Sequence, residues 1–221
     1  MRVELPQVAS VNVGQPRTVL VGRTEITSAI WKEPVAGRVR VGATNVEGDQ
    51  QADLRVHGGQ DKAVYAYAAE DLIWWAEQLG REIGPGMFGE NLTTTAVDLS
   101  ACLIGERWTV GSTVLEVASP RTPCFKLAAR FDDPGLPRRF AAAGRPGAYL
   151  RVVRSGDLAA GDRIDVVHRP GHDLTVGLVA RAYHQDHDLA PLLLEVAELP
   201  EDWRRWAGSM GQRPAGGAGP R

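Results

Sequence analysis

Short runs of alternating or β-branched residues, separated by turns rich in glycine and aspartate, fill about the first two-thirds of this 221-residue chain. The turns at Gly105, Gly111, Ser155-Gly156-Asp157 and Gly161-Asp162 are typical of the links between neighbouring strands. Many short strands at close spacing favour a barrel or a sandwich over a doubly wound sheet. The predicted strands are 7–13, 18–21, 38–41, 63–67, 91–94, 107–110, 113–117, 149–153 and 163–167.

Helices interrupt this pattern and then replace it. Residues 70–79 have helical apolar spacing with Gly80 as a stop signal, and a second helix is predicted over 136–143. Past residue 171 the pattern predicts three short helices, at 175–183, 189–197 and 201–207.

These patterns together indicate an α+β chain with a mainly β first part. We expect a β domain over residues 1–170, a small three-helix domain over 174–208, and a disordered tail rich in glycine and proline over 209–221.

Composition and charge argue against several classes of protein function. The net charge of -2 gives no reason to expect binding to nucleic acid or to a membrane, and no apolar run reaches membrane-spanning length. The chain has 2 cysteines, too few for a disulfide framework, and its first residues do not follow the signal-peptide pattern. We therefore expect a cytoplasmic protein with reduced thiols.

Cys124 is the strongest candidate for a chemical role. It lies behind Pro123, at a rigid corner between a predicted strand and a predicted helix over 125–131. If that helix begins near Pro123, its dipole favours the thiolate, and Arg121 and Lys126 act in the same direction. A thiolate is either a nucleophile or a soft metal ligand. The alternative is a half-buried structural cysteine.

A second candidate site is the turn His57-Gly58-Gly59-Gln60-Asp61-Lys62, which directly precedes the predicted strand 63–67. Successive backbone N–H groups in a glycine turn can bind an anion, and Lys62 and His57 add positive charge. The alternative is a hairpin turn that only carries polar side chains. The spacing does not decide between the two.

Specific motifs follow one another in a fixed order along the chain. They lie in the segments 10–14, 30–37, 48–53, 57–67, 88–93 and 120–127. Among these motifs are His57-Gly58-Gly59, Gly89-Glu90-Asn91-Leu92 and Pro123-Cys124. Taken in this order they resemble the MOSC family (molybdenum-cofactor sulfurase C-terminal domain), and most closely its stand-alone bacterial branch of hydroxylaminopurine-resistance reductases. The resemblance covers about residues 8–207, and the predicted helices are similar to the three-helix domain that follows MOSC in this branch.

The resemblance implies a MOSC β-barrel core with flanking helices that binds the molybdenum cofactor (molybdopterin). The family's conserved cysteine matches Cys124, which is then expected to ligate molybdenum through its thiolate, in agreement with the preference of soft metals for sulfur. Distant eukaryotic reductases with this domain have an arginine where this chain has Gly89, so the contacts to the cofactor's phosphate must differ in detail. Motif position and chemistry together assign cofactor binding to Lys32, Arg38, His57, Lys62, Asn91, Thr93 and Arg121.

The implied activity is the reduction of N-hydroxylated compounds, such as N-hydroxylated purines, to amines. Besides Cys124, the catalytic candidates are Asp61 and Glu90, either of which could deliver a proton. The chain has no flavin or nicotinamide fingerprint and no set of cysteines for an iron–sulfur cluster, so electrons would come from a separate reductase. The sequence does not decide whether the protein forms a homodimer.

Two other functions also stay open. A sulfur carrier, or a protein that transfers sulfur to the molybdenum cofactor, would use a persulfide on Cys124. It would need an outside sulfur donor, because the chain lacks the companion pyridoxal-phosphate domain. A non-catalytic binding module is the third hypothesis, and the presence of Cys124 beside the His57 and Asn91 motifs argues against it.

Overall fold

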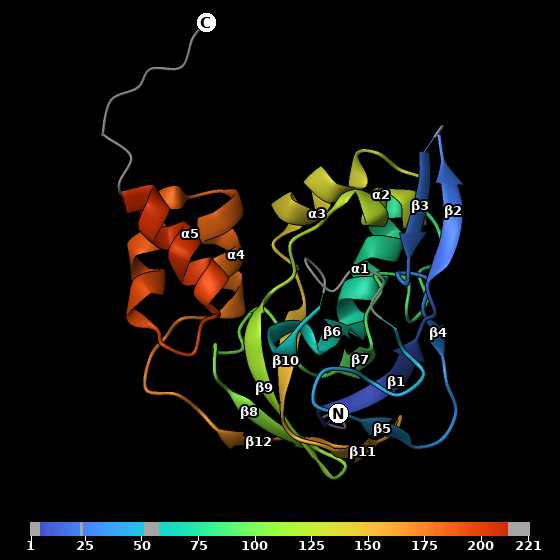
Figure 1. The fold of residues 1–221 in the computed structure, drawn as a ribbon, viewed down its shortest axis with the longest axis horizontal. Coiled ribbons are helices and arrows are strands. Elements are labelled where there is room, and N and C mark those ends of the chain that lie inside the picture. The colour runs from blue at the N-terminus through green and yellow to red at the C-terminus, as the bar shows by residue number, and fades with distance from the viewer. Residues whose placement is uncertain (1–4, 23, 51–57, 212–221) are drawn as a thin grey trace, which may run out of the picture.

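A central sheet organises the protein in the computed structural model, which describes residues 5–22, 24–50 and 58–211 (Figure 1). The sheet has eight strands in the order β12-β8-β9-β10-β6-β7-β1-β4. Only the β6–β7 pair is parallel within it, and the other pairs are antiparallel. The strands are β1 Gln7–Val13, β4 Glu33–Pro34, β6 Val64–Ala68, β7 Leu92–Thr95, β8 Arg107–Val110, β9 Thr113–Pro120, β10 Ala148–Arg154 and β12 Ile164–His168.

The strand ladders do not close into the expected barrel. An isolated bridge joins Gln7 to Arg163, and next to it the N–H of Ile164 donates to the carbonyl of Pro6 at 2.9 Å. The sheet therefore curves far enough for the start of β12 to meet β1, but a single bridge stands where a barrel would have a continuous ladder. The α+β class is confirmed.

Two small strand pairs lie outside the main sheet. In one, β2 (Arg17–Val21) pairs with β3 (Thr24–Ser28), and in the other, β5 (Val39–Val41) pairs with β11 (Gly156–Leu158). A turn was expected at β11, which begins at a glycine. Its pairing with β5, far away in the sequence, overrides the local turn signal.

The helices follow the predicted pattern, with one difference. The α-helices are α1 Ala69–Leu79, α2 Phe125–Phe131, α3 Leu136–Ala143, α4 Val176–His184 and α5 Glu201–Gly211, and η1 Gln60–Lys62 is a short 3-10 turn. The middle helix of the C-terminal group, η2 (His187–Glu195), is a 3-10 helix and not an α-helix. Pro191 lies inside it, lacks an N–H donor, and would clash with the preceding turn of an α-helix. None of the helices in the described ranges has the length and apolar character needed to cross a membrane.

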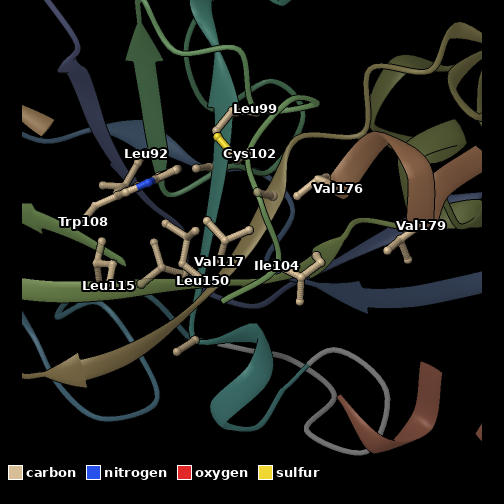
Figure 2. Close-up of a cluster of buried hydrophobic side chains, with 14 of the residues drawn as sticks. Leu92, Leu99, Cys102, Ile104, Trp108, Leu115, Val117, Leu150, Val176 and Val179 are labelled. Carbon is tan, nitrogen blue, oxygen red and sulfur yellow. The ribbon is translucent and has the colours of Figure 1, made fainter. Parts of the chain in front are cut away.

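Two groups of buried side chains hold these elements together. In the larger group, Ile104 and Val117 from the sheet region pack in the same cluster as Val176 and Val179 of α4 (Figure 2). The smaller group is largely aromatic and includes Tyr67, Trp75, Phe88 and Phe140 between the sheet and helices α1 and α3. Because one cluster runs from the sheet into the C-terminal helices, the division into domains 1–170 and 174–208 stays a prediction.

Candidate functional site

Cys124 lies at the corner that its sequence context predicts. Strand β9 ends at Pro120, helix α2 begins at Phe125, and Cys124 is the residue before the helix, with an extended backbone at φ -134° and ψ 174°. Its thiol is partly exposed, whereas that of Cys102 is buried, and neither is in a disulfide. The corner therefore places the Cys124 thiol near the protein surface, just beyond the end of strand β9.

Cys124 lines a small polar cavity of about 100 Å³, here called the cationic cavity. Positive groups dominate its charged lining, so the cavity suits a negatively charged ligand. The lining includes Lys32, Lys62, Arg121, Lys126, Asp49 and Asn91.

A buried ion pair forms one wall of the cationic cavity. Lys32 Nζ contacts Asp49 Oδ1, and Asp49 also accepts hydrogen bonds from Gly14 N–H at 2.7 Å and from Asn91 Nδ2 at 3.0 Å. Burial lowers the pKa of Lys32, although Asp49 acts in the opposite direction. Asp49 is not among the site residues predicted from the sequence. Its only signal there was its position in the segment 48–53 of the family resemblance.

Arg121 is the most exceptional group in the cationic cavity. Only 6% of the residue is exposed, and its guanidinium lies over the ring of Tyr65 at 5.2 Å and over that of Phe140 at 5.5 Å. Burial acts to lower its pKa, but nearby Tyr65, Tyr149 and Cys124 outweigh burial and the pKa is raised. Its buried Nη1 has no hydrogen-bond acceptor among the described residues. A buried donor without an acceptor is costly, so an anionic ligand at this point would relieve that cost.

Glu90, a predicted proton donor, is buried and does not line the cationic cavity, although its neighbours Gly89 and Asn91 do. Its carboxyl group accepts hydrogen bonds from Gly86 N–H at 2.5 Å, Phe88 N–H at 3.0 Å and Thr93 Oγ1 at 3.1 Å. Burial raises its pKa to about 7. In this position Glu90 holds the loop 84–89 against the sheet, and the loop in turn supports the cavity wall at Lys32.

The remaining predicted site residues lie elsewhere or outside the described ranges. Thr93 hydrogen-bonds Asn12 and Glu90 inside the sheet, and Asp61 pairs with Arg151. Arg38 pairs with Asp162 at 2.7 Å on the surface, and the lining of the cationic cavity includes none of the three. His57 lies outside the described residues. The structure therefore brings together Cys124, Lys32, Lys62, Asn91 and Arg121 from the predicted set.

A second, larger cavity of about 470 Å³, here called the aromatic cavity, meets the first at Cys124. Lys62, Cys124 and Tyr149 line both. Its other walls include Phe125 of α2, Tyr183 of α4, and Asp202, Trp203 and Trp206 of α5. The spacing of the two tryptophans on α5 is typical of a packing face. Trp203 is buried in the core and Trp206 packs against it, but both also line the cavity, a role that helical spacing alone cannot reveal.

Within the described ranges, no group of three His, Cys, Asp or Glu side chains could hold a metal ion. Among the described residues, Cys124 is therefore the candidate ligand for a soft metal that a cofactor would bring.

The model of the MOSC domain matches residues 53–165, which is about half of the chain. The chain belongs to the MOSC family. One relative is YflK of Bacillus subtilis (strain 168), which is 35% identical over 207 residues that cover 92% of this chain and 94% of YflK. Another is YiiM of Escherichia coli (strain K12), which is 32% identical over 184 residues that cover 80% of this chain and 82% of YiiM. A protein named Reductase from Gibberella moniliformis is 37% identical over 180 residues, which cover 80% of this chain but only 32% of that protein.

Solved MOSC structures have the same fold. The crystal structure of YiiM from Geobacillus stearothermophilus superimposes with a TM-score of 0.79 at 29% identity, covering 93% of this chain and 98% of that one. The crystal structure of YiiM from Escherichia coli superimposes with a TM-score of 0.70 at 25% identity. The match covers 92% of this chain and 91% of that one. The matched MOSC segment contains Cys124, Arg121 and Asn91 but ends before α4, so one wall of the aromatic cavity lies outside it.

Proposed function

We propose that this MOSC protein is a molybdenum-cofactor-dependent reductase that converts N-hydroxylated compounds, such as N-hydroxylated purines, to amines. The MOSC domain is associated with the molybdenum cofactor, and one relative is named a reductase. The observation that carries the proposal is the Cys124 thiol in the wall of a cavity where buried Arg121 has an unpartnered Nη1.

The residues of the cationic cavity fit this cofactor. The cofactor's phosphate is an anion, and Arg121, Lys62 and Lys126 supply positive donors for it. Lys32 and Asn91 are largely occupied with Asp49, so they would shape the wall more than they would hold the ligand. The thiolate of Cys124 suits a thiophilic metal such as molybdenum.

The chain's own groups would position the reaction and exclude water from it. When bound, the cofactor would supply a metal centre able to pass two electrons to the substrate. The net change is R–NHOH plus two electrons and two protons to R–NH₂ plus water, with the electrons supplied by a separate reductase. Neither Asp61 nor Glu90 is in the lining of the two cavities, whereas Lys62 lines both, so Lys62 is better placed to deliver a proton.

Elemental analysis of protein made in a host that synthesises the cofactor tests the proposal. We expect near-stoichiometric molybdenum in the wild type and in Cys102→Ala, and its loss in Cys124→Ala. The wild type should also reduce an N-hydroxylated compound with a surrogate electron donor.

Two results would contradict the proposal. One is a wild-type protein without molybdenum when a known molybdenum enzyme made in the same cells is loaded. The other is full activity in Cys124→Ala. A persulfide found on Cys124 by mass spectrometry, without metal, would instead support the sulfur-transfer alternative.

A further inference from the structure

The aromatic cavity has walls from two distant parts of the chain. Phe125 and Tyr149 come from the sheet side, whereas Tyr183 of α4 and Trp203 and Trp206 of α5 come from the C-terminal helices. Helix α4 packs against β9, and the C-terminal helices lie together at one side of the molecule (Figure 1). The cavity therefore exists only because α4 and α5 pack where they do.

The aromatic rings on the helix side form a connected group. The ring of Tyr183 lies 5.1 Å from that of Trp203 and 4.9 Å from that of Trp206, between centroids. Trp203 is 7% exposed and anchors the group in the core, and partly buried Trp206 lines the cavity beside it. Such fixed rings offer flat apolar faces against which a flat ligand can stack.

Phe125 completes the aromatic lining from the opposite side. It directly follows Cys124 in the chain, and 59% of it is exposed although it is a large apolar residue. Its side chain contributes little to the core, and it lines the aromatic cavity next to Cys124. An apolar ring in a cavity wall is available for contact with a ligand.

The charged side chains that line the two cavities differ, so each cavity favours a different kind of ligand. Among the described residues, the cationic cavity has four cationic side chains, Lys32, Lys62, Arg121 and Lys126, and one carboxylate, Asp49. The described lining of the aromatic cavity has one cation, Lys62, and one carboxylate, Asp202, so these formal charges cancel. A phosphate-bearing cofactor is favoured in the first, and an uncharged flat molecule in the second.

We propose that the aromatic cavity is the substrate subsite, where Phe125, Tyr183 and Trp206 select a flat, uncharged ring and hold its reactive group at the Cys124 junction. This inference rests on the proposed reductase function. It assigns the C-terminal helices a direct part in substrate choice.

Arg151 links the sheet side and the helix side of the aromatic cavity. Arg151 of β10 pairs with Asp61 in η1, next to Lys62, and its Nη1 donates to the carbonyl of Glu198 at 2.9 Å, just before α5. The side chain of Glu116 accepts from the same Nη1 at 2.9 Å and holds the guanidinium in place. The helix that carries Trp206 is thus tied to the turn that carries Lys62.

A matched pair of probes tests the subsite without using the metal. Benzamide is flat and cyclohexanecarboxamide is puckered, and both are uncharged amides of similar size. We would titrate each into the full-length protein, prepared with and without the cofactor, and measure Kd by calorimetry or ligand-observed NMR. We expect benzamide to bind about fivefold to tenfold more tightly, as the worth of an aromatic stacking contact indicates.

Variants then assign the selectivity to the rings. Trp206→Ala and Phe125→Ala should each reduce the preference for benzamide to less than about twofold. Trp74→Ala is the matched control, because Trp74 is likewise partly buried but belongs to the other apolar cluster and lines neither cavity. Phe125→Ala keeps the test valid if Trp206→Ala does not fold, since Phe125 is exposed.

The inference fails if the two probes bind equally to the wild type, if neither binds, or if both ring variants keep the preference. Because the readout is binding, its outcome is separate from that of the reductase proposal. Selective binding without molybdenum-dependent reduction would overturn the reductase function alone. Reduction without selective binding would overturn the subsite alone.

Discussion

Glu90 gives the protein a pH dependence of stability that a single substitution should remove. The carboxyl group is fully buried, and burial raises its pKa from 4.5 to about 7. Each pKa unit corresponds to about 1.4 kcal/mol, so the shift is worth about 3 kcal/mol between its two protonation states.

The sign follows from where the proton binds. Below pH 4.5 both the folded and the unfolded protein hold the proton, and the contribution of Glu90 to stability is fully present. Between pH 4.5 and about 7 the unfolded protein releases the proton and the folded protein keeps it, so the free energy of unfolding falls as the pH rises. Above about pH 7 the whole of this contribution is lost.

Urea unfolding of wild type and Glu90→Gln at intervals from pH 4 to pH 8 measures the effect. The substitution adds a constant cost, since the new amide cannot accept every hydrogen bond that the carboxyl group accepts from Gly86, Phe88 and Thr93. The difference between the two proteins should nevertheless shrink by about 3 kcal/mol as the pH rises. Glu77→Gln, at an exposed position on α1, serves as the control. A difference that stays constant across this range would refute the reasoning.

Two further substitutions test how the cavity wall is built, each against a matched partner. Gly86→Ala should cost about 2 kcal/mol or more in the free energy of unfolding, because Gly86 has φ +81° and a Cβ there would lie 2.5 Å from the carbonyl oxygen of Lys32. Gly80→Ala, at φ +63° with open space around it, should cost about 1 kcal/mol, and equal losses in chemical denaturation would count against the close approach. Asp49→Asn should cost about 3–5 kcal/mol, because buried Lys32 loses its charge partner. Arg107→Gln breaks a pair whose arginine side chain is 44% exposed and should cost less than about 1 kcal/mol, and the same denaturation series would expose an error in this ranking.

The parts of the fold that the sequence predicts are those with local signals. Helix α3 ends at Gly144 as its glycine stop predicts, and the proline-rich corner places Cys124 directly before α2. The spacing of apolar residues likewise predicts α1 and most strands of the sheet. Each of these depends on residues within one or two turns of each other.

The features that the sequence does not predict depend on distant contacts. Strand β11 forms because β5 pairs with it, and the barrel stays open because β12 meets β1 only at one bridge. Asp49 becomes part of the site through Lys32 and Asn91, which lie on other segments. Trp206 shares a helix face with Trp203, but only the packing of α5 against the sheet side decides that this face borders a cavity.

The place of β10 in the sheet has a consequence for how the chain is made. Strand β10 lies between β9 and β6, although β6, β7, β8 and β9 all precede it in the sequence. A chain growing from its N-terminus therefore builds two partial sheets, β1-β7-β6 and β8-β9, before the strand that joins them exists. Until residues 148–154 emerge, the edges of β6 and β9 are both uncovered and able to pair with other chains. The interval between the synthesis of β9 and that of β10 is thus one period in which these two strand edges of a nascent chain are exposed to aggregation.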